Sequence, residues 1–192
     1  MLENKHRDLR LSSTGINDII QVGMMAAITY VATVMFHIPS FMGVVHLGDS
    51  MIFLAAILLG KRKAAASSAI GMALFDILTG YGHWAPFTFV IKGVMGYIAG
   101  SIAYRKGQDG KNIWNNLFAF SIAGIFMIAA YYLSGVVMAR FILLKTATLN
   151  QAFILAIKDI PGNISQVVAG IIIGLPLSIT LKKALKRANI SL

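Results

Sequence analysis

The sequence contains no cysteine and only seven acidic residues among its 192 positions. Without cysteine, the chain has no disulfides, no thiolate metal sites and no cysteine nucleophile. The sole glutamate is Glu3, so no glutamate pair is available for a membrane metalloprotease. No G-x-x-x-x-G-K-[ST] loop occurs, which argues against ATP hydrolysis by a Walker mechanism. The four histidines lack metal-ligand spacing, and we therefore expect no metal, no cofactor and no enzymatic activity.

Charge of either sign is scarce. Charged residues make up 12% of the chain and hydrophobic residues 57%, whereas a soluble domain carries about 25% charged residues. The net charge of +10 would suggest a nucleic-acid partner in a soluble protein. Here the basic residues form short clusters between apolar runs, which favours a lipid bilayer as the surroundings and no nucleic acid as a partner.

Apolar runs long enough for membrane helices recur along the chain. A spanning helix needs about 20 mostly apolar residues. The candidates are residues 16–36, 47–60, 64–80, 86–104, 114–140 and 160–181, with a short apolar segment at 151–157. The second run is short, and by length alone it is also compatible with a re-entrant segment. Pro161 suits the first turn of the last helix.

The placement of basic residues tests this map. If all six runs cross, the inner segments contain most of the 17 basic residues: Lys5, Arg7, Arg10, Lys61, Arg62, Lys63, Arg105, Lys106, Lys111, Lys182, Lys183, Lys186 and Arg187. The outer loops then hold Arg140 and Lys145, and Lys158 lies just before the last run. This distribution obeys the positive-inside rule. The sequence thus predicts a single all-α membrane domain with six transmembrane helices (16–181), between a cytoplasmic N-terminal tail (1–15) and a basic cytoplasmic C-terminal tail (182–192).

Small residues four positions apart mark places where helices can approach closely. Gly96 and Gly100 form one such pair, and Gly170 and Gly174 form another. Gly23 and Ala27 have the same spacing on the first helix. Such pairs serve either internal packing or the binding of a partner helix.

Two ionisable residues flank the loop between the third and fourth predicted helices. Asp76 and Lys92 lie at similar depth, and charges inside a bilayer usually face each other or a cavity. One reading is a structural ion pair between them. In the other, Lys92 donates to a ligand while Asp76 orients it.

The remaining polar and aromatic residues gather toward the same outer side. Tyr81, His83 and Trp84 are either interfacial anchors or a stacking surface for a flat ligand. His46 precedes Asp49, which we interpret as a favourable charge at a helix N-terminus. A separate pair, Asn163 and Gln166, shares one helix face because its members are three residues apart. Together these residues predict a small-molecule pocket open to the outside.

Three segments carry a resemblance to a known family. "VHLGDSMIFLAAILLG", "SSAIGMALFDILTGYGHWAPFTFVIKGVMGYIAG" and "PGNISQVVAGIIIGLPL" resemble the substrate-binding S components of energy-coupling factor (ECF) vitamin transporters. The H-L-G-D, D-x-L-x-G-Y and P-F-T-F-V-I-K-G motifs within them are the most specific. The match is strongest to the group assigned to hydroxymethylpyrimidine or vitamin B6-like compounds, and it extends to the riboflavin-type members.

The resemblance implies a fold, partners and a site. It implies six helices in a bacterial plasma membrane, a transmembrane T component, two cytoplasmic ATPase subunits and a small vitamin as ligand. The T component is expected to contact Gly23 and Ala27 on the first helix. The family's pocket region contains His46, Trp84, Lys92, Asn163 and Gln166, and we add Tyr81, His83 and Asp76 as candidates. A solitary secondary transporter or channel for a small solute is the alternative.

Overall fold

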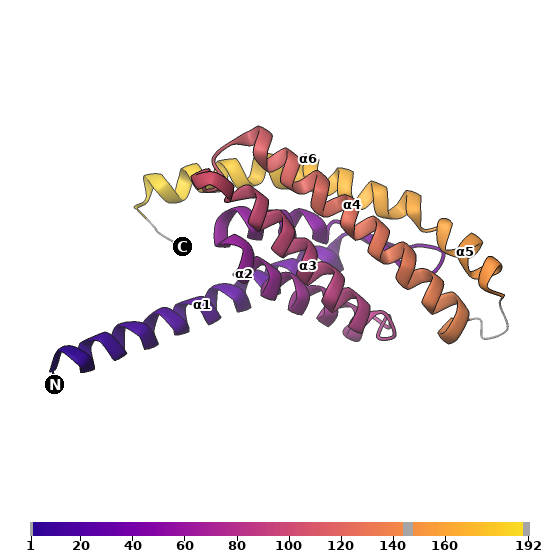
Figure 1. Ribbon diagram of the computed structural model, residues 1–192, viewed down its shortest axis with the longest axis horizontal. Helices are drawn as coiled ribbons and strands as arrows, with labels where there is room; N and C mark the ends of the chain where they lie inside the picture. Colours follow the sequence, from indigo (N-terminus) through magenta and orange to yellow (C-terminus); the bar gives the residue numbers. More distant parts are fainter. Residues whose placement is uncertain (1, 144–147, 190–192) are drawn as a thin grey trace.

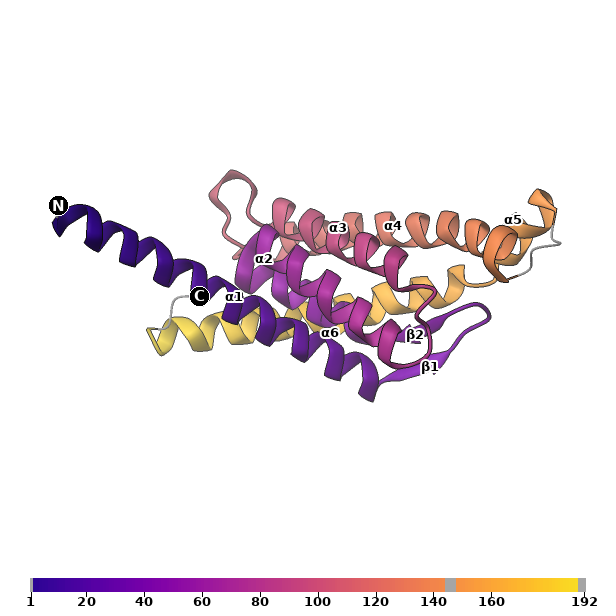
Figure 2. The ribbon, with the colours of Figure 1, turned by 90° about the horizontal axis from the view of Figure 1, so that it is seen from below.

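A computed structural model describes residues 2–143 and 148–189, which fold into an elongated helical bundle (Figures 1 and 2). Its α-helices are α1 (Leu2–Met35), α2 (Gly48–Leu78), α3 (Ala85–Ala103), α4 (Ile113–Val137), α5 (Leu149–Ile157) and α6 (Ile160–Arg187). A 3₁₀ turn (Arg105–Gly107) precedes α4, and a π-helical turn (Met138–Leu143) follows it. Two short antiparallel strands, β1 (His37–Pro39) and β2 (Val44–His46), form a hairpin between α1 and α2.

The helices agree with the predicted class, but their division differs from the prediction. The predicted runs 47–60 and 64–80 are two legs of α2, and the short apolar segment 151–157 is a helix of its own, α5. The predicted N-terminal tail belongs to α1, which begins at Leu2 and projects away from the bundle (Figure 1). Pro161 lies in the first turn of α6, as predicted.

The chain reverses direction inside α2. Gly60 has φ 74° and ψ 177°, a conformation open essentially to glycine alone. After the reversal, the Met72 sulfur lies near Gly48 and accepts a hydrogen bond from the Thr33 hydroxyl at 3.3 Å. Since Gly48 begins the first leg and Met72 lies late in the second, the two legs run antiparallel. A sequence reading by hydropathy finds both legs but not their continuity.

Four described stretches are long and apolar enough to cross a membrane: Gly15–Met35, Ala85–Ala103, Ile113–Ile142 and Leu149–Arg187. The chain is therefore a multi-pass membrane protein. The legs of α2 do not meet this criterion as one helix, because every 18-residue window of α2 includes Lys61, Arg62 and Lys63 at the bend.

Both predicted glycine pairs lie at close helix–helix approaches. A side-chain carbon at Gly96 would lie 2.9 Å from the Ala64 carbonyl oxygen, and one at Gly100 2.6 Å from the Lys61 Cα. A carbon at Gly174 would lie 3.0 Å from the Ser50 carbonyl oxygen. Internal packing explains these pairs. Gly23 differs, because in the part of the chain that the structure describes no atom beyond its own stretch of helix lies within 4 Å of a side-chain carbon placed there.

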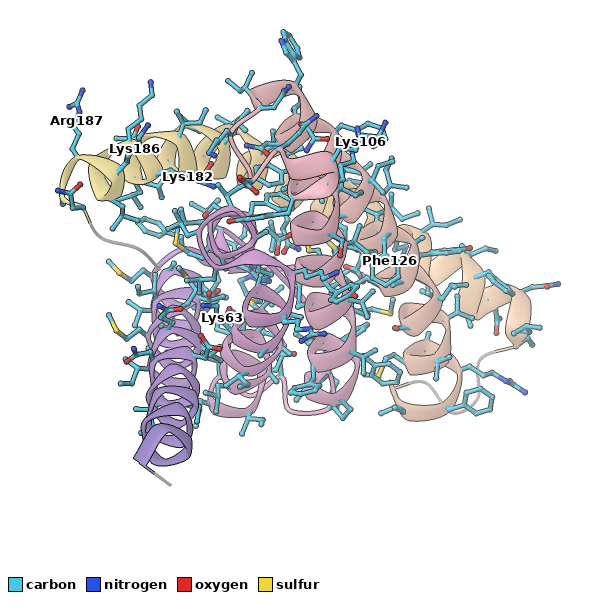
Figure 3. The ribbon with its side chains drawn as sticks, turned by 60° about the vertical axis from the view of Figure 1, so that its left-hand side comes forward. Lys63, Lys106, Phe126, Lys182, Lys186 and Arg187 are labelled. Carbon is cyan, nitrogen blue, oxygen red and sulfur yellow. The ribbon has the colours of Figure 1, made fainter. Side chains whose placement is uncertain are left out.

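The two ends of the bundle have different chemistry. The N-terminal end of α1 and the C-terminal end of α6 lie at one end, and the β-hairpin and α5 lie at the other (Figure 2). At the first end, which we call the basic end, Lys63 pairs with Asp18 at 3.1 Å. Lys182 donates to the Ile57 carbonyl at 3.3 Å there and also contacts the Asp109 carbonyl. Figure 3 labels Lys63, Lys106, Lys182, Lys186 and Arg187 of this end.

Candidate ligand-binding site

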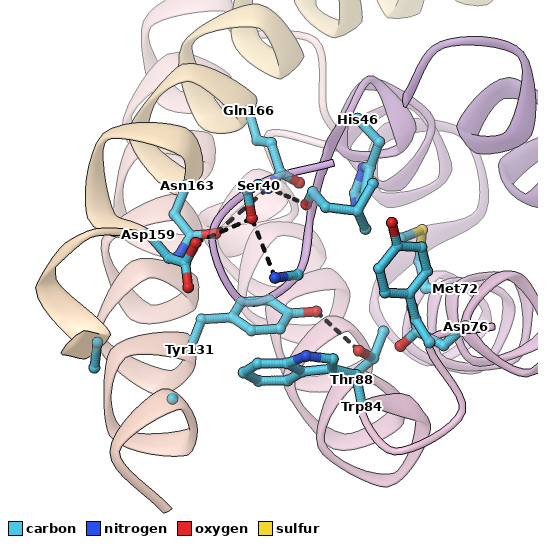
Figure 4. Close-up of a pocket in the computed structure, with 15 residues that line it drawn as sticks. Ser40, His46, Met72, Asp76, Trp84, Thr88, Tyr131, Asp159, Asn163 and Gln166 are labelled. Atoms are coloured by element: carbon cyan, nitrogen blue, oxygen red, sulfur yellow. Dashed lines mark hydrogen bonds between the residues drawn. The ribbon is translucent and has the colours of Figure 1, made fainter. Parts of the chain in front are cut away.

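A pocket lies at the end of the bundle opposite the basic end, under the β-hairpin (Figure 4). It is lined by Ser40, Gly43, Val44, His46, Met72, Asp76, Tyr81, Trp84, Thr88, Tyr131, Gly135, Ala156, Asp159, Asn163 and Gln166. The empty space of the pocket and of its opening to solvent is together about 530 Å³. Its walls combine aromatic rings with a few polar groups.

Six of the predicted site residues line this pocket: His46, Asp76, Tyr81, Trp84, Asn163 and Gln166. They come from β2, the end of α2, the turn before α3 and the first turns of α6. His83 does not line it; its side chain is exposed, and its ring centroid is 6.4 Å from that of Trp84. Lys92 does not line it either.

Lys92 is fully buried and forms an ion pair with Asp49. From the sequence, Asp76 is a candidate partner of Lys92, and Asp49 is a favourable charge at a helix N-terminus. The difference arises because the first leg of α2 runs alongside α3, which brings Asp49 level with Lys92. Charges removed from water need a close partner, and Asp49 supplies it. The Lys92 ammonium also lies 5.2 Å from the centre of the Tyr131 ring.

The β-hairpin is tied to the pocket walls by hydrogen bonds from several elements. The Trp84 indole N–H donates to the Met42 carbonyl at 2.7 Å. A single carboxylate oxygen of Asp159 accepts from the Ser40 hydroxyl at 3.0 Å and the Met42 N–H at 3.3 Å. Gln166 donates to the Val44 carbonyl at 3.3 Å. The hairpin therefore covers the pocket through contacts with the α2–α3 turn and the start of α6.

His46 is held in its neutral form. Burial, and to a smaller extent the charges of Lys92 and His37, lowers the pKa of the His46 imidazole well below its ordinary value. Its Nδ1 accepts from the Gly48 N–H at 3.2 Å, so the ring proton is on Nε2. His46 thus adds no positive charge to the pocket at neutral pH.

The sequence reading missed Tyr131, Thr88 and Asp159. The Tyr131 hydroxyl donates to the Thr88 hydroxyl at 3.1 Å, a bond between α4 and α3 that no local pattern reveals. Asp159 did carry a signal, because an acidic residue between two apolar segments needs an explanation. Ser40 belongs to a loop whose return over the pocket is visible only in three dimensions.

Comparison with known proteins places this chain in a transporter family. A family model of the S component of ECF-type riboflavin transporters matches residues 13–183. The chain belongs to this family of ECF S components. The family is one of transporter components and not of enzymes, which agrees with the sequence analysis.

Two relatives of this S component extend the comparison. An uncharacterised protein from Pyrococcus woesei is 34% identical over 151 residues, covering 76% of this chain and 87% of that protein. The thiamine precursor transporter HmpT from Lactococcus lactis subsp. cremoris is 26% identical over 171 residues, covering 88% and 89%. The resemblance to ECF S components, including the group for hydroxymethylpyrimidine, is thereby confirmed.

The buried ion pair makes a prediction about stability. Lys92→Met leaves Asp49 as an unpaired buried charge and should lower the free energy of unfolding by about 3–5 kcal/mol. Adding Asp49→Asn to that variant should recover most of the loss, because the stranded charge is removed. Adding Asp76→Asn instead should not. Melting curves of the detergent-solubilised variants measure both, and equal recovery with either second substitution would contradict the assignment of Asp49 as the partner.

Proposed function

We propose that this S component captures a small water-soluble vitamin or vitamin precursor, of the hydroxymethylpyrimidine or pyridoxine type, at the outer face of a bacterial plasma membrane. A transmembrane T component and two cytoplasmic ATPase subunits then drive its uptake. The observation that carries this proposal is the aromatic- and amide-lined pocket at the end of the bundle opposite the basic clusters.

The lining suits a flat polar ring. Trp84, Tyr81 and Tyr131 offer aromatic surface, and stacking on a ring is worth about 0.5–1.5 kcal/mol beyond the area buried. Asn163 and Gln166 are buried, and amides can both donate to and accept from the polar edge of a heterocycle. The relative HmpT is a thiamine precursor transporter, which supports a small vitamin precursor as the ligand.

The distribution of basic residues supports an orientation of the bundle in the membrane with the pocket on the outer side. In the proposed topology all six segments cross, counting the legs of α2 separately, and the basic end faces the cytoplasm. The pocket then opens to the outside. A vitamin reaches it without entering the lipid.

A reporter fused after Leu192 should therefore indicate the cytoplasm, and one inserted at His83 the exterior. His83 suits the insertion because it is exposed in the turn before α3. Alkaline phosphatase and green fluorescent protein fusions report opposite sides and control for each other. An external C-terminus would rule out this topology.

The face of α1 around Gly23 and Ala27 is the proposed docking surface for the T component. Both residues are exposed. Among the described residues, no atom of another element lies within 4 Å of a side-chain carbon placed at Gly23, whereas Gly96, Gly100 and Gly174 have such close neighbours. Large exposed side chains surround them, including Ile20, Met24 and Ile28. A small-residue notch within an apolar ridge suits close approach of a partner helix.

Ala27→Trp should block uptake by cells, because the bulky ring fills this notch, while vitamin binding to the isolated S component stays intact. Ala129→Trp is the matched control, since Ala129 is an exposed alanine on α4, and it should leave uptake unchanged. Uptake of labelled vitamin and binding to purified protein are measured side by side. Normal uptake in the Ala27 variant would move the docking surface elsewhere.

Substitutions in the pocket test the capture step. Trp84→Ala and Asn163→Ala should each weaken ligand binding by roughly tenfold or more, a loss of about 1.4 kcal/mol. The controls are Trp114→Ala and Asn150→Ala, since both residues are exposed away from the pocket. Titration calorimetry measures affinity, and melting curves of ligand-free protein identify variants that merely unfold. Unchanged affinity in both pocket variants would contradict the proposed site.

A further inference from the structure

Tyr131 of α4 is held by a row of three side chains on α3. Trp84, Thr88 and Lys92 are each four residues apart, so they lie on one face of α3 from its N-terminal end inward. The ring centroids of Trp84 and Tyr131 are 6.0 Å apart. The Tyr131 hydroxyl donates to the Thr88 hydroxyl at 3.1 Å. The Lys92 ammonium lies over the Tyr131 ring, 5.2 Å from its centre.

This row leads from the pocket into the interior of the bundle. Trp84, Thr88 and Tyr131 line the pocket, whereas Lys92 lies beyond its lining and is fully buried. Figure 4 shows the Tyr131 ring next to Trp84, with a dashed line from its hydroxyl to Thr88. Lys92 can therefore act on a bound ligand through the ring that it contacts, without touching the ligand.

Asp49 fixes the position of the Lys92 ammonium. The Asp49 Oδ1 accepts a hydrogen bond from the ammonium, and neither side chain is exposed. A side-chain carbon at Gly170 would lie 3.1 Å from the Asp49 Cβ, so α6 packs closely against this residue. The ion pair thus joins the first leg of α2 to α3, next to α6. Because a buried charge cannot leave its partner without a large cost, the ammonium stays over the ring.

The ammonium restrains the Tyr131 ring in a way that the hydroxyl bond does not. The hydroxyl oxygen lies on the axis of χ2, so rotation about χ2 turns the ring and leaves that oxygen in place. The bond to Thr88 therefore does not set the plane of the ring. An ammonium is attracted to the face of an aromatic ring, most strongly where water is excluded. Lys92, over the face, opposes the rotation.

We infer that Lys92 is a positioning residue for ligand capture, which sets the plane of the Tyr131 ring in the pocket wall. This inference rests on the proposed function, and it gives Lys92 a role beyond neutralising Asp49. Stacking depends on the relative orientation of two rings. A ring already held in its plane gives up less conformational freedom when a flat ligand binds. Removal of the ammonium should therefore weaken binding in a protein that remains folded.

Uncharged pairs remove the ammonium without stranding a buried charge. Purified full-length protein with Lys92→Met and Asp49→Asn is titrated calorimetrically with 4-amino-5-hydroxymethyl-2-methylpyrimidine and with pyridoxine. Its affinity for the probe that the unmodified protein binds more tightly should fall about tenfold. Lys92→Met with Asp49→Leu is a second such pair, since apolar side chains often replace a buried ion pair without loss of stability. Lys63→Met with Asp18→Asn is the matched control at the basic end and should leave the affinity unchanged.

A double-mutant cycle with Tyr131 distinguishes positioning from a general structural effect. Tyr131→Phe keeps the ring under the ammonium and should retain the affinity within about threefold, whereas Tyr131→Leu should lose about tenfold or more. In the Tyr131→Leu protein, replacing the Lys92–Asp49 pair should cause no further loss, because the ring that transmits its effect is gone. Melting curves of ligand-free protein identify variants that unfold.

Unchanged affinity in either folded uncharged pair would overturn the inference and leave vitamin capture standing. A further tenfold loss on replacing the pair in the Tyr131→Leu protein would do the same, with about tenfold being the size of the effect in the unmodified background. Equal losses in Tyr131→Phe and Tyr131→Leu would also overturn it, and this comparison does not need either uncharged pair to fold. Failure of the unmodified protein to bind either probe would instead contradict the proposed function.

Discussion

The reversal of α2 at Gly60 brings both ends of one helix to the same end of the bundle, and the pocket depends on this placement. The first leg runs parallel to α3, as shown by Asp49 beside Lys92 and by the Tyr104 hydroxyl donating to the Ile57 carbonyl. The second leg runs antiparallel to α3, with Gly100 against Lys61. Asp76 therefore reaches the pocket from the leg that returns to it. A residue with a side chain at position 60 could not adopt this φ and ψ without strain.

The buried ion pair and the pocket divide the charges between them. Lys92 lies within a helix long and apolar enough to cross the membrane, where an unpaired ammonium is costly. Asp49 neutralises it, and the ring of Tyr131 covers it from α4. As a result the lining keeps its acidic residues and its aromatic rings, and no lysine or arginine of the described ranges 2–143 and 148–189 lines the pocket. The same arrangement that satisfies Lys92 thereby sets the chemistry of the proposed site.

The sequence predicted the helical membrane class and six of the fifteen residues that line the pocket. His46, Trp84, Asn163 and Gln166 were predictable because polar and aromatic residues at the ends of apolar runs need partners or a ligand. The partner of Lys92 was not predictable, because Asp49 and Asp76 both lie toward the outer ends of predicted membrane helices, at a depth in the bilayer that Lys92 could share. Nor were the bonds from Ser40 and Met42 to Asp159, which join residues more than a hundred positions apart. Local patterns identify which residues need partners, whereas packing decides which partners they receive.

Mass spectrometry of small molecules released from the purified, full-length S component tests the central claim most directly. The protein is isolated from cells in mild detergent, denatured, and its ligand compared with that from the Asn163→Ala variant. The account predicts a small water-soluble vitamin or vitamin precursor, of the hydroxymethylpyrimidine or pyridoxine type, that is depleted in the variant preparation. Recovery of no such compound, or of one that the variant retains equally, would contradict it.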